Sequence, residues 1–69
     1  MLDQKQFTLK QLRGLSGMSQ KELADKIGVT ERTIGNYENV EGKLADAPYS
    51  KIKAIAAALD VSVDDIFLG

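Results

Sequence analysis

The chain has neither a cysteine nor a histidine among its 69 residues, and this narrows the ways in which it can become stable. A domain of this size buries only a small core, for which disulfides, metal ions or a partner subunit often compensate. A disulfide is excluded. Only carboxylates remain as metal ligands, and they form no cluster in the sequence that suggests a metal site. We therefore expect one domain, over 1–69, that has no cofactor and is stabilised by packed helices or a partner subunit.

Apolar residues recur with helical spacing, and no segment alternates apolar and polar residues as a half-buried strand would. The sequence predicts an all-α fold of five short helices, over about 4–15, 19–28, 30–38, 49–59 and from 62 onward. The segment 39–48 is expected to be a loop. The residues expected to face the core are Leu9, Leu12, Leu23, Ala24, Ile27, Ile34, Tyr37, Ile52, Ile55, Ala56, Leu59, Val63, Ile66 and Phe67, with Phe7 or Leu15 at the edge.

The second and third helices carry clear end signals. Ser19 is followed three residues later by Glu22, which is the pattern of a capping box. Gly28 suits the left-handed backbone that ends a helix, and Thr30 is a good N-cap. Ala24 is small where a second helix would cross closely, and Val29 can fill the space between the two. The stretch 20–39 therefore predicts two helices joined by a short turn, with one helix protruding.

With its neighbours, this stretch resembles the phage-repressor/Cro type of helix-turn-helix, often called the XRE family. The resemblance covers about residues 5–68. It rests on Leu12-Arg13, Met18-Ser19-Gln20-Lys21-Glu22-Leu23-Ala24, Gly28-Val29-Thr30, Tyr37-Glu38-Asn39 and Ala58-Leu59-Asp60-Val61-Ser62-Val63-Asp64. It implies a lambda-repressor-like domain, of bacterial or phage origin, that binds double-stranded DNA through the major groove and regulates transcription, most simply as a repressor.

In that family the N-terminal part of the third helix meets base edges. The resemblance assigns base contacts to Thr30, Glu31, Arg32, Thr33 and Asn36. Arg32 can bond twice to guanine, Asn36 twice to adenine, and Glu31 can accept from cytosine. The competing interpretation is an ordinary solvated helix face, and for Glu31 a side chain that only stabilises the first turn.

Gln20 resembles the family's phosphate-binding glutamine, at a helix N-terminus whose free N–H groups attract anions. The full set of expected phosphate contacts is Ser19, Gln20, Lys43, Tyr49, Ser50 and Lys51. Taken one at a time, some lysines are better explained as solvated charges than as phosphate contacts, namely Lys21, Lys26, Lys51 and Lys53. After Asn39 this chain inserts Val40 and Glu41 before Gly42, where the family usually has glycine and then basic residues, so contacts from this loop are in doubt.

The resemblance also implies an ion pair between Arg13 and Glu38 that joins the first and third helices. One small module binds DNA weakly, so we expect a homodimer on a pseudo-palindromic operator. The nine basic residues all lie in 1–53, with a net charge of +2, whereas 54–69 carries −3 and is a suitable dimer surface. Phe67 and Leu68 are its candidate contacts; alternatively, Phe67 closes the core.

Two other functions stay open beside the regulator. One is an antitoxin that binds a toxin and represses its own operon, and the other is a protein-interaction module on the same fold. An enzyme is not expected, because the chain has no histidine, no cysteine, no phosphate loop and no carboxylate pair with a plausible pocket. No apolar run is long enough to span a membrane, and the polar N-terminus resembles no signal peptide, so a cytoplasmic protein is expected.

Overall fold

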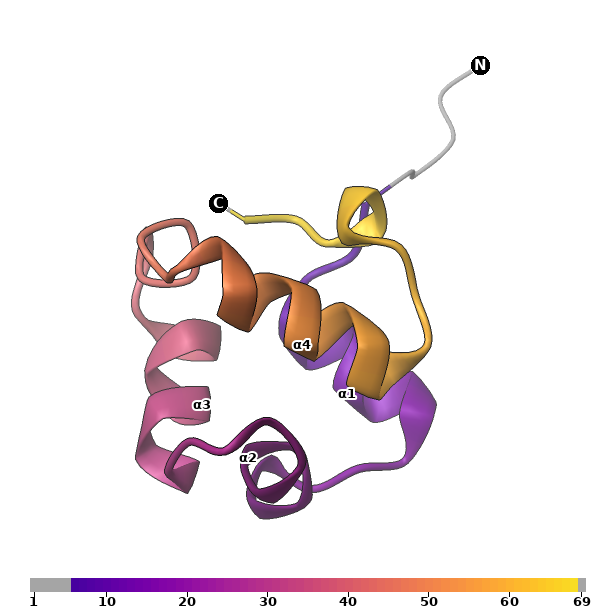
Figure 1. The fold of residues 1–69 in the computed structure, drawn as a ribbon, viewed down its shortest axis with the longest axis vertical. Coiled ribbons are helices and arrows are strands. Elements are labelled where there is room, and N and C mark those ends of the chain that lie inside the picture. The colour runs from indigo at the N-terminus through magenta and orange to yellow at the C-terminus, as the bar shows by residue number, and fades with distance from the viewer. Residues whose placement is uncertain (1–5, 69) are drawn as a thin grey trace.

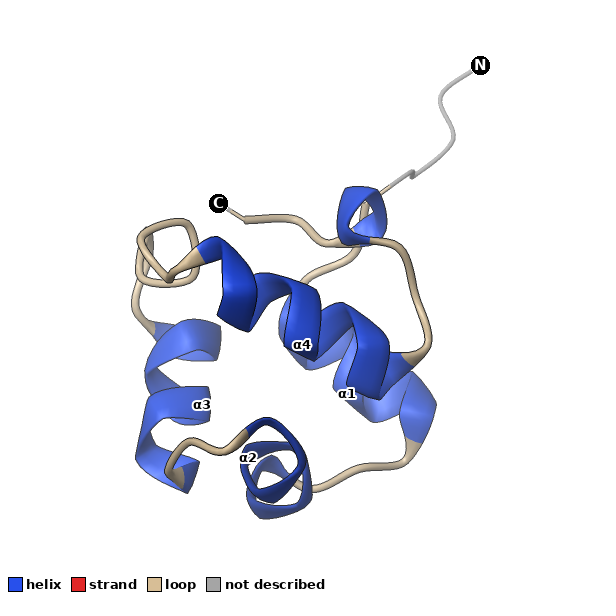
Figure 2. Cartoon of the chain, viewed as in Figure 1, coloured by secondary structure: helices blue, strands red, loops and turns tan. Residues whose placement is uncertain are grey.

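The computed structural model describes residues 6–68, and this part of the chain folds into a bundle of short helices (Figure 1). The elements are α1 (Leu9–Ser16), α2 (Gln20–Ile27), α3 (Glu31–Asn39), α4 (Tyr49–Leu59) and the 3-10 helix η1 (Val63–Asp65). No strand is present among the described residues, as the colouring by secondary structure shows (Figure 2). The predicted all-α fold is therefore confirmed, with four α-helices rather than five.

The helices pack around one core. Both α1 and α2 contact α3 and α4 (Figure 1). The core lies where these four helices meet. The fully or nearly fully buried side chains are Leu9, Leu12, Leu23, Ala24, Ile27, Ile34, Leu44, Ile52, Ile55, Ala56, Leu59 and Ile66. Most of these positions were predicted from helical spacing alone, because the apolar face of each helix is the face that the fold buries.

The N-terminal boundary of α1 was predicted wrongly. Gln6 to Thr8 is extended, and Thr8 is the N-cap of α1 in a capping box with Gln11. Phe7 forms a parallel bridge with Ile66, with Phe7 N–H donating to Asp65 and Phe67 N–H donating to Phe7. Pairing with the C-terminal segment holds this stretch extended, so the helix starts only after Thr8. The predicted residues 4 and 5 lie outside the described part.

The predicted fifth helix is a single 3-10 turn. Ser62 caps it, and the expected capping box with Asp65 is present. The turn ends at Ile66, because the bridge to Phe7 draws the chain into an extended conformation there. Ile66 is buried, whereas Phe67 is 48% exposed, so Phe67 is not the core residue that helical spacing predicted.

The segment 40–48 is not an open loop, since most of it consists of consecutive turns. Leu44 points from these turns into the core and is only 4% exposed. Burial of Leu44 was not predicted from the sequence, which placed it in a loop. Conversely, Leu15 was placed at the edge of the core and is 78% exposed.

Candidate nucleic-acid interface

The pair formed by α2 and α3 positions the residues that the sequence singled out. Ser19 caps α2 in a capping box with Glu22, and Gly28 ends the helix with φ 77°, in the left-handed region that glycine adopts at little cost. Ala24 is buried where the two helices meet, and Val29 packs against the core from the turn. This local geometry matches the prediction from 20–39.

The N-terminal part of α3 is open to solvent. Thr30 caps the helix by accepting the N–H of Thr33, and its hydroxyl also lies 2.9 Å from the hydroxyl of Thr33. Glu31 and Arg32 are exposed, and within residues 6–68 neither forms an ion pair or a side-chain hydrogen bond. The charged and amide groups of this face are therefore available to a ligand, whereas the two hydroxyls already bond to each other.

An open hollow lies between the start of α2 and the outer face of α3. It is lined by Gln20, Glu31, Arg32, Gly35, Asn36 and Asn39. Four of the six are residues that the sequence analysis proposed as DNA contacts. Asn39 was quoted there only as part of the family pattern, although its position three residues after Asn36 places both on one helix face.

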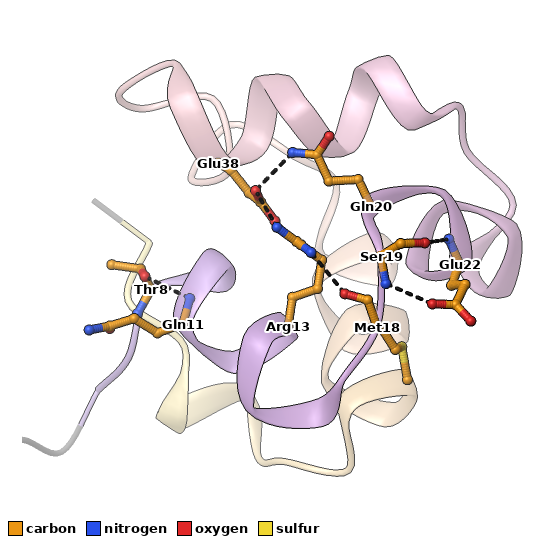
Figure 3. Close-up of polar contacts among 8 residues, drawn as sticks. All are labelled: Thr8, Gln11, Arg13, Met18, Ser19, Gln20, Glu22 and Glu38. Atoms are coloured by element: carbon orange, nitrogen blue, oxygen red, sulfur yellow. Dashed lines mark hydrogen bonds and ion pairs between the residues drawn. The ribbon is translucent and has the colours of Figure 1, made fainter.

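A largely buried ion pair joins the helices behind this face (Figure 3). Arg13 Nε donates to Glu38 Oε2 at 2.6 Å, and Arg13 Nη2 donates to Glu38 Oε1 at 3.3 Å. Arg13 also donates to the carbonyl of Met18, at 2.8 Å. The hydrogen bonds from Arg13 to Glu38 raise the pKa of the arginine further above its ordinary value, so the guanidinium stays charged. It joins α1 to α3 and to the segment before α2.

Gln20 is bonded to this ion pair. Its side-chain Nε2 donates to Glu38 Oε1 at 3.0 Å, across from α2 to α3 (Figure 3). The Glu38 side chain is only 1% exposed. The expected phosphate contact is thus held by a buried carboxylate, which the sequence analysis did not foresee.

The remaining expected phosphate contacts lie in different surroundings. Lys43 is exposed in the turns after α3, and Tyr49 and Ser50 are exposed in the first turn of α4, whose N-cap makes no side-chain bond. Lys51 differs, because its ammonium donates to the carbonyl of Ile27 at 3.2 Å. Lys51 therefore bonds to the end of α2 rather than pointing freely into solvent.

A second depression adjoins the hollow at Asn39, which lines both, and lies between the C-terminal part of α3, the following turns, the start of α1 and the C-terminal segment. Phe67 and Leu68 line it together with Tyr37, Val40 and Leu44. Val40 and Phe67 are both exposed here. The two residues proposed as dimer contacts therefore belong to one apolar surface.

The described acidic side chains include no group of three that could hold a metal ion. None of the described helices is both long enough and apolar enough to cross a membrane.

Comparison with known proteins agrees with this geometry. The model of a helix-turn-helix family matches residues 9–66. The chain is 38% identical, over 58 residues, to an uncharacterized HTH-type transcriptional regulator, YobD, of Bacillus subtilis (strain 168). That match covers 84% of this chain and 49% of YobD, so the chain spans about half the length of this relative. No solved structure matches.

Proposed function

This chain belongs to the helix-turn-helix family, and on that basis we propose that it binds double-stranded DNA and regulates transcription as a repressor. The observation that carries the proposal is the exposed face of α3. Arg32, Asn36 and Glu31 stand there without protein partners among the described residues, beside the hollow at the start of α2. Arg32 pairs with guanine, Asn36 with adenine, and Glu31 accepts from cytosine N4.

The phosphate contacts we propose surround this face. The backbone N–H groups of Gln20 and Lys21 meet one phosphate, since those of Ser19 and Glu22 are bonded within the capping box. The start of α4 at Tyr49 and Ser50 meets another phosphate. Lys43 supplies a charge from the turns after α3. Asn39, which lines the hollow, joins this set. We leave Lys51 out of it, because its ammonium bonds to Ile27.

The protein acts as a homodimer on a pseudo-palindromic operator, with its two recognition helices about 34 Å apart. A single module of this size buries only about 600–1,000 Å² against DNA, which gives weak binding. The apolar surface around Phe67, Leu68 and Val40 supports the pairing, because dimerisation would remove the exposed side chains of Phe67 and Val40 from water.

The test is selection of binding sites from a random duplex library, with the wild-type protein and with Arg32→Ala. A palindromic consensus is expected, and the variant should lose preference at one base pair in each half-site, by about 1–3 kcal/mol. Lys10→Ala, an exposed position of α1 that lines neither depression, removes the same charge and is a control that should keep the consensus. Absence of any enriched sequence, even at low salt, would contradict the proposal and would favour a protein partner instead.

A further inference from the structure

The side chain of Gln20 does not extend freely into solvent, although it lies at the edge of the proposed DNA-binding face. Its Nε2 bonds to Glu38 Oε1 at 3.0 Å, and Glu38 in turn accepts two hydrogen bonds from Arg13. The three residues come from α2, α3 and α1 respectively (Figure 3). A chain of hydrogen bonds therefore runs from the buried ion pair to the hollow.

The chemistry of Glu38 fixes which way the amide of Gln20 faces. A carboxylate only accepts hydrogen bonds, so Gln20 must turn its NH2 group toward Glu38 and its carbonyl oxygen away from it. No hydrogen bond among residues 6–68 engages that oxygen. Gln20 therefore presents a carbonyl oxygen and one remaining N–H in a fixed orientation.

The amide lies beside α3 at Gly35. Both its oxygen and its nitrogen lie 4.0 Å from the point where Gly35 would carry a Cβ, which is ordinary contact distance. Arg32 and Asn36 line the same hollow. A glutamine side chain that is already ordered loses less conformational entropy on binding than a mobile one, so it binds more tightly for the same contact.

We propose that Glu38, itself held by Arg13, is a positioning residue that orients Gln20 for contact with DNA. This rests on the proposed function and goes beyond the role of the ion pair in joining α1 to α3. The ion pair of Arg13 and Glu38 thus raises the affinity for DNA only through Gln20, and neither of its own side chains contacts the DNA.

The decisive variant replaces both members of the pair, as Arg13→Met with Glu38→Leu. Replacing a buried ion pair by apolar residues of similar volume usually keeps the fold, whereas removing one partner alone destabilises it strongly. The double replacement also leaves the net charge unchanged, so long-range attraction to DNA is preserved. We expect native circular dichroism, a dissociation constant for the selected duplex raised about fivefold to tenfold, and an unchanged salt slope.

The dependence on Gln20 is measured by repeating the replacement in a Gln20→Ala background. There we expect it to change the dissociation constant by less than about twofold, because coupled residues give non-additive effects. The control is Lys21→Gln with Asp25→Asn, which removes the exposed ion pair of α2. It also leaves the net charge unchanged, and the affinity for DNA should not change. Equal losses with and without Gln20, or no loss at all, would overturn the inference.

A measurement on the unaltered protein does not depend on how the variants fold. The side-chain NH2 protons of Gln20 should exchange slowly with water in the free protein, and the proton bonded to Glu38 should resonate downfield of its position in a free glutamine. Resonances like those of a free glutamine would overturn the inference. A protein that holds Gln20 in this way but binds no duplex would instead show that the proposed function has failed, and the inference with it.

Discussion

The ammonium of Lys51, in the first turn of α4, donates a hydrogen bond to the backbone carbonyl of Ile27, 3.2 Å away at the end of α2. A cation at this place satisfies one of the carbonyls that a helix leaves unpaired, and it complements the negative end of the helix dipole. The residue that sequence analysis proposed as a phosphate contact is thus engaged in joining two helices.

Lys51→Met should therefore lower the free energy of unfolding by about 1–2 kcal/mol, as loss of a charge-assisted hydrogen bond does. It should leave the salt dependence of DNA binding unchanged. Urea unfolding and titrations of a labelled duplex at several salt concentrations measure the two effects. Lys43→Met is the matched control, with unchanged stability and a salt slope that is smaller by about 0.9. A smaller salt slope for Lys51→Met, or a loss of stability for Lys43→Met, would contradict this.

Leu44 lies outside any helix and yet is buried, at 4% exposure. Leu44→Ala should cost about 2–4 kcal/mol of stability, because it leaves a cavity where the turns after α3 close the core. Leu15→Ala is the control, since Leu15 is 78% exposed and its truncation should stay within about 0.5 kcal/mol of the wild type. Equal effects in urea unfolding would contradict the burial of Leu44.

Asp60 ends α4 with φ 59°, in the left-handed region, and places a negative charge at the negative end of the helix dipole. Asp60→Asn should raise the stability by about 0.5 kcal/mol, because asparagine suits this backbone and carries no charge. Asp46→Asn, an exposed change in the turns after α3, alters net charge equally. If both variants gain the same stability in thermal unfolding, overall charge explains the gain instead.

Glu22 accepts the backbone N–H of Ser19 at 2.8 Å, and this hydrogen bond lowers its pKa below the ordinary 4.5. A carboxyl whose pKa is lower in the folded state stabilises the fold above its unfolded pKa, and the contribution is lost as the pH falls through the folded pKa. Glu22→Gln should therefore be less stable than the wild type at pH 7, and the difference should shrink toward pH 3.

The control for that series is Glu31→Gln, in the first turn of α3. Glu31 makes no comparable hydrogen bond within the described residues. Urea unfolding of all three proteins between pH 3 and pH 7 gives the comparison. A pH dependence of Glu22→Gln that is the same as that of the wild type would show that the capping box contributes nothing through its charge.

Phe67 is proposed to contact a second copy of the chain. Phe67→Ser should weaken binding to a duplex with two half-sites on the order of tenfold, which corresponds to ~1.4 kcal/mol. Binding to a duplex with a single half-site should not change, because one copy makes no subunit contact there. Band-shift titrations measure both. If the two duplexes lose affinity equally, Phe67 acts within the subunit rather than between subunits.

Much of this fold could be predicted from short-range signals. The pair Ser19 and Glu22, the turn at Gly28 and the cap at Thr30 each act within a few residues, and the structure has all of them. What sequence analysis missed depends on contacts between distant residues. No local pattern shows that Phe7 pairs with Ile66, so the start of α1 and the length of the last helix were both predicted wrongly.

The same distinction applies to the candidate site. The residues of α3 follow helical spacing, and Asn39 could have been found from it. Gln20 and Glu38 lie on different helices, and their hydrogen bond depends on how α2 packs against α3. The burial of Leu44 likewise depends on tertiary packing. It could not be predicted because a single leucine within a loop sequence shows no periodicity.

The bridge between Phe7 and Ile66 bears on the order in which the chain folds. Its two segments are separated by almost the whole sequence, so closing it costs loop entropy that the local α2–α3 contacts do not incur. A chain growing from the ribosome can form α2 and α3 before its last residues emerge, but it cannot hold Phe7 in place. In pulse-labelled refolding, the amides of Phe7 and Phe67 should gain protection last, and earlier protection there would contradict this order.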